Sequence, residues 1–289
     1  MITLLNNKGK LFLVATPIGN IEDISIRALK TLKEVDLIAA EDTRRSIKLL
    51  NYYDIKKRLT SYHEHNEKTK GKHLMELLTD GKNIAVISDA GCPGISDPGR
   101  EIIKLCAENE IEVTMIPGPS ALTTGIALSG MHVESFVFEG FLPTDKKDLA
   151  KRLALLKEEK RTMIFFEAPH RLLATLKKIF EVFGNREIVL ARELTKKYEQ
   201  IIRTTIERAI NDFLEKEPRG EFVVIVQGAK EEKDSVKMNK NELKKLVKSY
   251  IDSGMDKKDA LKKVAKSQNV RKNEIYKLLL EDKKAGESE

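Results

Sequence analysis

A loop rich in glycine and proline, residues 88–99, constrains this chain more than any other segment. Its sequence is Ser-Asp-Ala-Gly-Cys-Pro-Gly-Ile-Ser-Asp-Pro-Gly. The apolar run 83–87 before it predicts a buried strand, and residues 100–107 after it have a helical pattern. Holding such a loop in one conformation costs backbone entropy. It is therefore typical either of a tight turn or of a ligand site at the carboxyl end of a parallel sheet.

Two further strand-like runs end in loops of the same kind. Residues 11–15 lead into Thr-Pro-Ile-Gly-Asn at 16–20, and residues 112–116 lead into Pro-Gly-Pro-Ser-Ala at 117–121. Parallel strands end at a common edge of their sheet, so we expect the three loops to converge there.

Strand and helix patterns alternate through the first part of the chain. The expected strands are 11–15, 36–41, 59–62, 84–88 and 112–116, with helical patterns between them, for example at 24–32 and 72–78. This alternation predicts an α/β domain over residues 1–120 with a mainly parallel sheet.

A second α/β domain is predicted over residues 121–230. Its expected strands are 135–139, 161–166, 187–191, 198–204 and 221–226. The short connection at Lys196 and Lys197 fits an antiparallel hairpin, so this sheet should be mixed. The polar stretch 231–240 is interpreted as a linker.

The remaining segment, 241–284, predicts a small helical domain. Apolar residues at Leu243, Leu246, Val247 and Tyr250 follow helical spacing. Further helical patterns at 257–266 and 271–280, separated by a short turn, resemble a helix-turn-helix. A small helical cap that binds nothing would give the same weak pattern.

The net charge of the chain is concentrated in this last segment. Between residues 240 and 284 there are fourteen Lys and Arg against seven Asp and Glu, so this window carries the whole net charge of +7. A neutral body with a basic tail indicates a polyanionic partner, most simply nucleic acid. A lysine-rich solvated helical face is the alternative.

Several classes of protein are disfavoured by what the sequence lacks. No apolar run approaches the roughly 20 residues needed to cross a bilayer, and the N-terminus has no signal-peptide pattern. Cys92 and Cys106 give neither a disulfide framework nor a zinc spacing, so we expect a reduced, cytoplasmic protein without a membrane partner. The glycine fingerprints of dinucleotide enzymes and P-loop NTPases are absent. His63-Glu64-His65 makes a poor chelate, so no metal is expected.

A cluster of charges ends the second expected strand. Glu41, Asp42, Arg44 and Arg45 lie where substrates bind at the carboxyl edge of such sheets. The arginines could hold a phosphate and an acid could deprotonate a hydroxyl. The same residues could instead provide an N-cap and an ion pair for a helix beginning near Ser46.

Six motifs together resemble a known family. They are residues 13–20, 40–44, 88–99, 117–121, 138–143 and 167–171. In this order they are similar to the tetrapyrrole methylase superfamily, and within it to the enzymes that methylate small-subunit ribosomal RNA. The resemblance implies two α/β/α domains with S-adenosyl-L-methionine in the cleft between them, and a homodimer.

The implied reaction is 2′-O-methylation of a cytidine in the decoding centre of 16S rRNA, as free rRNA or in the assembled 30S subunit. By similarity, the cofactor is held by Pro17, Asp89, Gly91, Cys92, Pro93, Ile95, Ser120, Ala121, Ala168, Ala191 and Gly220. Cys92 stands where the family more usually has Thr, so a hydroxyl contact is not expected there.

The chemistry requires that a ribose hydroxyl lose its proton as it attacks the methyl group in line. Our hypothesis is that Glu41 or Asp42 accepts this proton and that Arg44 holds a phosphate or lowers the pKa of the hydroxyl. RNA contacts are expected from Arg45, Lys257, Lys258, Arg271 and Lys272.

Two other functions compete with this hypothesis. One is a porphyrinoid or diphthine-type methyltransferase of the same superfamily, against which the motifs at 41–44 and 167–171 and the basic tail argue. The other is a ligand-sensing regulator that binds nucleic acid. Its recognition helix would be only moderately basic, because Glu274 lies among its cations.

Overall fold

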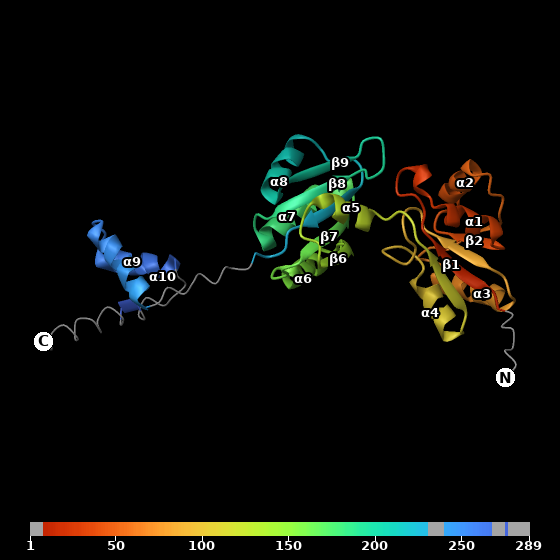
Figure 1. Ribbon diagram of the computed structural model, residues 1–289, viewed down its shortest axis with the longest axis horizontal. Helices are drawn as coiled ribbons and strands as arrows, with labels where there is room; N and C mark the ends of the chain where they lie inside the picture. Colours follow the sequence, from red (N-terminus) through yellow and green to blue (C-terminus); the bar gives the residue numbers. More distant parts are fainter. Residues whose placement is uncertain (1–7, 231–239, 268–274, 277–289) are drawn as a thin grey trace. The chain divides into compact units, whose positions relative to one another are not determined.

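The structure is a computed structural model that describes residues 8–230, 240–267 and 275–276. The chain divides into two compact units, Met1–Ala229 and Lys230–Glu289. Figure 1 labels their helices and strands. The predicted boundary between residues 120 and 121 lies inside the first unit and stays a prediction. The predicted linker 231–240 lies outside the described residues, except for Lys240, which begins a helix.

The first sheet of the first unit has five parallel strands in the order β3-β2-β4-β1-β5. These strands are β1 Lys10–Val14, β2 Leu37–Ala40, β3 Leu59–Ser61, β4 Ile84–Ile87 and β5 Glu112–Ile116. A short 3₁₀ turn, η1 Ile21–Asp23, and four helices accompany them: α1 Ile26–Glu34, α2 Thr43–Tyr52, α3 Glu67–Thr79 and α4 Arg100–Glu108.

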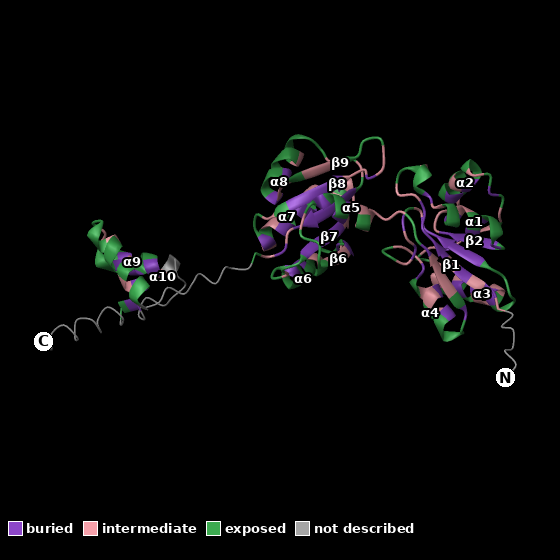
Figure 2. Cartoon of the chain, viewed as in Figure 1, coloured by how far each residue is buried: buried purple, intermediate pink, exposed green. Residues whose placement is uncertain are grey.

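Alternate residues of these strands enter two separate apolar cores. In β4, Ile84 and Val86 pack with α3 and α4, whereas Ala85 and Ile87 pack with α1 and α2. Successive side chains of a strand point to opposite faces, so helices cover both faces of this sheet. Figure 2 shows the resulting pattern of buried strands and helices whose outer faces are exposed.

The second sheet of the first unit has the order β6-β7-β10-β8-β9. Its strands are β6 Phe136–Phe141, β7 Thr162–Glu167, β8 Glu187–Arg192, β9 Gln200–Thr205 and β10 Phe222–Val226. The associated helices are α5 Ala121–Ser129, α6 Lys146–Leu156, α7 Pro169–Phe183 and α8 Ile206–Glu215. β6 and β7 are parallel and the other pairs are antiparallel, so the predictions of a mixed sheet and of a hairpin at Lys196 and Lys197 are confirmed.

The two faces of the second sheet are covered unequally. On one face the strands pack with α6, α7 and α8 around Phe165, Leu172 and Leu176. On the other face α5 contributes Ile126 to a smaller core, at whose margin Ile18 of the first half also packs. Phe166, near the carboxyl end of β7, is only partly buried in this smaller core and also lines the candidate site.

The predicted fold class is confirmed, and two helices begin elsewhere than the sequence pattern indicated. α1 begins at Ile26 because the Ser25 hydroxyl caps it by accepting a hydrogen bond from the Ala28 amide. α2 begins at Thr43 rather than near Ser46, because Asp42 caps it.

The second unit contains α9 Lys240–Asp252 and α10 Lys257–Ser267. Leu243 and Val247 of α9 are buried against Leu261 and Val264 of α10, as the spacing predicted. The turn and second helix of the proposed helix-turn-helix, with Arg271 and Lys272, lie outside the described residues apart from positions 275 and 276. Among the helices that are described, none has the length and apolar character to cross a membrane.

Candidate active site

Hydrogen bonds join the three loops that follow β1, β4 and β5. Thr16 and Gly91 exchange two backbone bonds, of 2.9 and 3.0 Å, and the Thr16 hydroxyl donates to the Ser88 carbonyl at 3.0 Å. The Cys92 thiol lies 3.7 Å from the carbonyl oxygen of Pro119, to which it donates. The predicted convergence of the loops is therefore confirmed.

Glycine is required at two points of the loop 88–99. Gly91 has φ +86° and Gly99 has φ +142°, conformations that other residues rarely adopt. A Cβ on Gly99 would lie 3.1 Å from the Gly94 nitrogen. The Gly99 amide also donates to the Glu67 carboxylate at 2.8 Å, which fixes the end of the loop against the start of α3.

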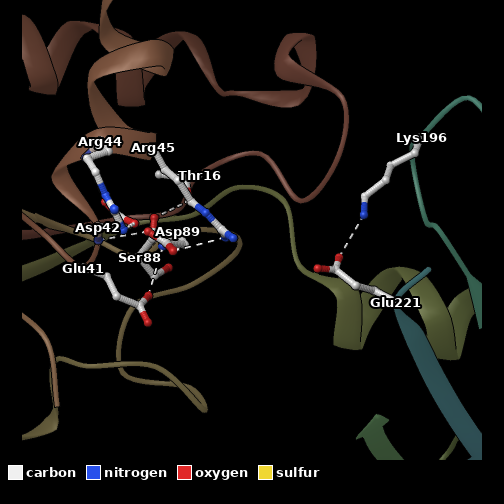
Figure 3. A network of polar contacts seen from close by, with 9 residues as sticks. All are labelled: Thr16, Glu41, Asp42, Arg44, Arg45, Ser88, Asp89, Lys196 and Glu221. Atoms are coloured by element: carbon white, nitrogen blue, oxygen red, sulfur yellow. Dashed lines mark hydrogen bonds and ion pairs between the residues drawn. The ribbon is translucent and has the colours of Figure 1, made fainter. Parts of the chain in front are cut away.

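Glu41 and Asp89 hold the ends of β2 and β4 together (Figure 3). The Asp89 amide donates to Glu41 Oε2 at 3.1 Å, and the Asp42 amide donates to Asp89 Oδ1 at 3.0 Å. Arg45 Nη1 lies 3.2 Å from Asp89 Oδ2. Each carboxylate thus satisfies an amide of the neighbouring strand end, and Asp89 also has a cationic partner.

Asp42 and Arg44 form the helix N-cap and the ion pair that the sequence offered as the alternative to a catalytic role. Asp42 caps α2 by accepting a 2.8 Å bond from the Arg44 amide, and its Oδ2 lies 2.8 Å from Arg44 Nη2. The hydrogen bonds from Arg44 lower the pKa of the Asp42 carboxyl to about 2. A carboxylate with so low a pKa is a weak base.

Asp97 is a candidate functional residue that the sequence analysis did not single out. Burial, followed by the nearby charges of Glu41 and Asp89, raises its pKa to about 7, although a hydrogen bond with Ser88 opposes the shift. It forms no ion pair with any Lys, Arg or His of the described chain. The available signal was its position as a second acid within the glycine-rich loop.

Lys196 lies at the opposite, second-sheet side of the site. Its Nζ is 2.9 Å from Glu193 Oε1 and 2.9 Å from Glu221 Oε2. Burial alone would lower the pKa of Lys196, but these two carboxylates raise it overall. The lysine is therefore a protonated cation at neutral pH.

Glu167 ends β7 as a buried carboxylate whose acceptor oxygens are occupied. It accepts hydrogen bonds from the Thr175 hydroxyl at 2.6 Å and from the Ala168 amide at 3.0 Å, and Arg171 Nε lies 3.4 Å away. His170 of the same motif is exposed and does not line the cavity described next.

These groups line a cavity of about 540 Å³, a size typical of small-molecule sites. Its apolar wall comes mainly from Phe166, Ala191, Leu194 and Val223. The charged residues that line it are Glu41, Asp89, Asp97, Glu167, Glu221, Arg45 and Lys196. Five carboxyl groups therefore face two cations.

The structure brings some of the predicted site residues to this cavity and not others. The lining includes Glu41, Arg45, Asp89, Ile95, Ala121, Ala168 and Ala191. It does not include Asp42, Arg44, Pro17, Gly91, Cys92, Pro93, Ser120 or Gly220. Several of the second group directly adjoin lining residues, as Pro17 adjoins Ile18 and Gly220 adjoins Glu221. The proposed roles of all these residues stay predictions.

The cavity lining does not include the other described residues that the sequence singled out, Lys257, Lys258, His63 and His65. Lys257 and Lys258 are exposed at the start of α10 in the second unit. His63 and His65 have ring centroids 6.0 Å apart. Among the described residues, no group of three or more His, Cys, Asp or Glu could hold a metal ion.

The raised pKa of Asp97 predicts a pH-dependent stability. Between about pH 4 and 7 the Asp97 carboxyl is ionised in the unfolded chain but still protonated in the folded protein. The free energy of unfolding therefore falls as the pH rises through this range. Asp97→Asn removes this effect and should raise the melting temperature relative to wild type at pH 8, with the gain shrinking toward pH 4. Thermal unfolding across this range tests it, with exposed Asp80→Asn as control. A gain independent of pH would contradict the assignment.

Comparisons with known proteins give the family. The sequence profile of the tetrapyrrole (corrin/porphyrin) methylases matches residues 10–210. The chain is 46% identical to "Ribosomal RNA small subunit methyltransferase I" of Halalkalibacterium halodurans, over 94% of each chain. It is 52% identical to the protein of that name from Thermotoga maritima, over 76% of this chain and 99% of the relative.

Among solved structures, the chain resembles a cobalt precorrin-4 methyltransferase and a uroporphyrin III C-methyltransferase from Thermus thermophilus. The first comparison has a TM-score of 0.58 at 16% identity and covers 75% of this chain and 94% of that one. The second has a TM-score of 0.56 at 16% identity and covers 76% and 97%. These two matches show a shared fold, and the family expected from the sequence motifs is confirmed. The chain belongs to the tetrapyrrole (corrin/porphyrin) methylase family.

Proposed function

We propose that this protein is an S-adenosyl-L-methionine-dependent methyltransferase of small-subunit ribosomal RNA. The observation that carries the proposal is the 46% identity, over 94% of both chains, to a relative with that activity in its name. The finer assignment, the 2′-oxygen of one cytidine in the decoding centre, follows the family resemblance of the sequence motifs. A homodimer acting in the cytoplasm is part of the same proposal.

The chemistry of the cavity fits this cofactor. S-adenosyl-L-methionine would supply a methyl group activated by a positively charged sulfur, and that charge disappears on transfer. Five lining carboxyl groups against two cations favour a cationic ligand. The apolar wall around Phe166 and Val223 suits an aromatic base, and Asp89 and Ala168 are among the residues that would hold the cofactor.

The proton acceptor is best sought among the lining carboxyl groups. As the ribose oxygen attacks the methyl carbon, the hydroxyl proton must leave and the carbon–sulfur bond must break. Asp42 is disfavoured as the acceptor because its oxygens cap α2 and bind Arg44. Asp97 has a pKa of about 7, which suits a general base near neutral pH, and it lines the cavity together with Glu41. We therefore place the acceptor at Asp97, with Glu41 as the second candidate.

Transfer of labelled methyl from S-adenosyl-L-methionine tests the function directly. The substrates are rRNA and small subunits from a strain that lacks this protein, followed by nuclease mapping. We expect label on one ribose of 16S rRNA. Cofactor binding without transfer to any RNA would favour a porphyrinoid or diphthine-type methylase, and no cofactor binding would refute the proposal.

Carboxamide variants test the proton acceptor. Asp97→Asn should lower kcat, measured at saturating S-adenosyl-L-methionine, by about 10²- to 10⁴-fold, the usual contribution of a general base. Asp42→Asn serves as the matched control and should retain most of the turnover. Normal turnover in Asp97→Asn together with loss in Glu41→Gln would transfer the role to Glu41.

Truncation tests the basic second unit as an RNA-binding element. Removing residues 236–289 should weaken RNA binding and flatten its dependence on salt, because released counterions scale with the phosphates contacted. Cofactor affinity should be spared, since all the lining residues of the cavity lie in the first unit. Filter binding across a range of salt concentrations measures both effects. A salt slope equal to that of the full chain would show that this unit does not bind RNA.

A further inference from the structure

Lys196 places a positive charge in the cavity lining, and a cationic cofactor does not account for a cation at this position. It lines the cavity with its side chain 30% exposed, and its ammonium is held by two carboxylates at 2.9 Å. Arg45, the other lining cation among the described residues, is paired with Asp89 near the strand ends. Figure 3 shows the pair of Arg45 with Asp89 and the contact of Lys196 with Glu221.

The two partners of Lys196 differ in how firmly they are held. Glu193 is 19% exposed, and its Oε1 also accepts the Glu221 amide at 2.9 Å. It lies so close to Gly220 that a Cβ there would be 2.5 Å from Glu193 Cγ. The Glu221 side chain, in contrast, is 76% exposed and makes its described contact with Lys196 alone. Glu193 is therefore a fixed partner, whereas water or another anion can replace Glu221.

The loop 16–20, which follows β1, holds the lysine side chain in position. A Cβ on Gly19 would lie 2.6 Å from Lys196 Cγ, so the aliphatic part of the lysine packs directly on that glycine. The Asn20 amide also donates to the Thr195 hydroxyl at 2.9 Å. Glu193 and Thr195 have positive φ values of 51° and 64°, which are uncommon for residues other than glycine. The backbone thus accepts an unfavourable conformation next to a lysine whose position is fixed.

We propose that Lys196 binds a backbone phosphate of the RNA substrate at the cavity, and that Glu221 is the anion that this phosphate displaces. The inference rests on the proposed function. An exposed ion pair is weak and exchanges readily, so replacing Glu221 costs little. A phosphodiester also gives the ammonium a charge-assisted partner, while Glu193 keeps the lysine in place. Contact with the backbone would orient the target ribose without reading the base.

Three variants test this inference, because each is expected to change the Kd for RNA in a different way. Lys196→Gln should raise the Kd and KM for small-subunit RNA roughly tenfold and reduce the salt slope by about 0.7, the contribution of one single-strand phosphate. Lys197→Gln is the matched control, since this neighbour is exposed and outside the cavity lining. Glu221→Gln should leave the RNA Kd at or below the wild-type value, because it removes the competing anion.

A merely structural ion pair predicts a different pattern, in which Lys196→Gln and Glu221→Gln both weaken RNA binding. That result would overturn the inference. So would a rise in the Kd of S-adenosyl-L-methionine in Lys196→Gln, which would assign the lysine to the cofactor, or a Lys196→Gln variant that matches Lys197→Gln. Because RNA binding is measured directly, the test of Lys196 does not depend on the outcome of the methyl-transfer assay. A wild type that binds RNA but transfers no methyl refutes the proposed reaction, and the binding data still decide the role of Lys196.

Discussion

The paired backbone hydrogen bonds between Thr16 and Gly91 are the constraint on which the site depends. They join the ends of neighbouring parallel strands, β1 and β4, directly beyond the register pair Val14 and Ile87. The positive φ of Gly91 makes this bridge possible. Because the bridge fixes the start of the loop 88–99, it also fixes Asp89 on one side and Cys92 on the other. The part of the lining that the loop 88–99 contributes, including Asp89, therefore follows from a backbone contact rather than from side-chain packing.

Two of the lining acids, Glu41 and Asp97, have no ion-pair partner among the described residues, and of these Glu41 accepts the Asp89 amide. Glu167 is buried, yet Thr175 and the Ala168 amide satisfy its oxygens. Asp89 has Arg45 and an amide. Asp97 is buried and faces two other carboxylates, which is why its pKa rises although a hydrogen bond with Ser88 opposes the shift. A positively charged ligand in the cavity would favour the ionised form of Asp97, so binding of such a ligand and loss of the proton are coupled.

The sequence predicted the strands and loops well because apolar runs and Pro/Gly loops are local signals. It left the role of Asp42 open, because an N-cap and a catalytic acid look alike without coordinates. It missed Asp97 because burial is not visible in a local pattern and because the nearest distinguishing charge, Glu41, comes from a distant segment of the chain. The setting of Lys196 was equally hidden, since its stem packs on Gly19. Contacts between distant segments leave no periodic trace in a sequence.

An acidic cavity and an RNA substrate place opposite electrostatic demands on one protein. Carboxyl groups that favour a cationic cofactor repel a polyanion, and two lining cations cannot offset five acids. We propose that affinity for RNA comes instead from an electrostatic contact made by the excess of Lys and Arg between residues 240 and 284, none of which is among the lining residues. Lys257 and Lys258, exposed at the start of α10, are well suited to it. Under this proposal, the basic unit would supply affinity that does not depend on base sequence, while the two cations at the cavity would position one nucleotide.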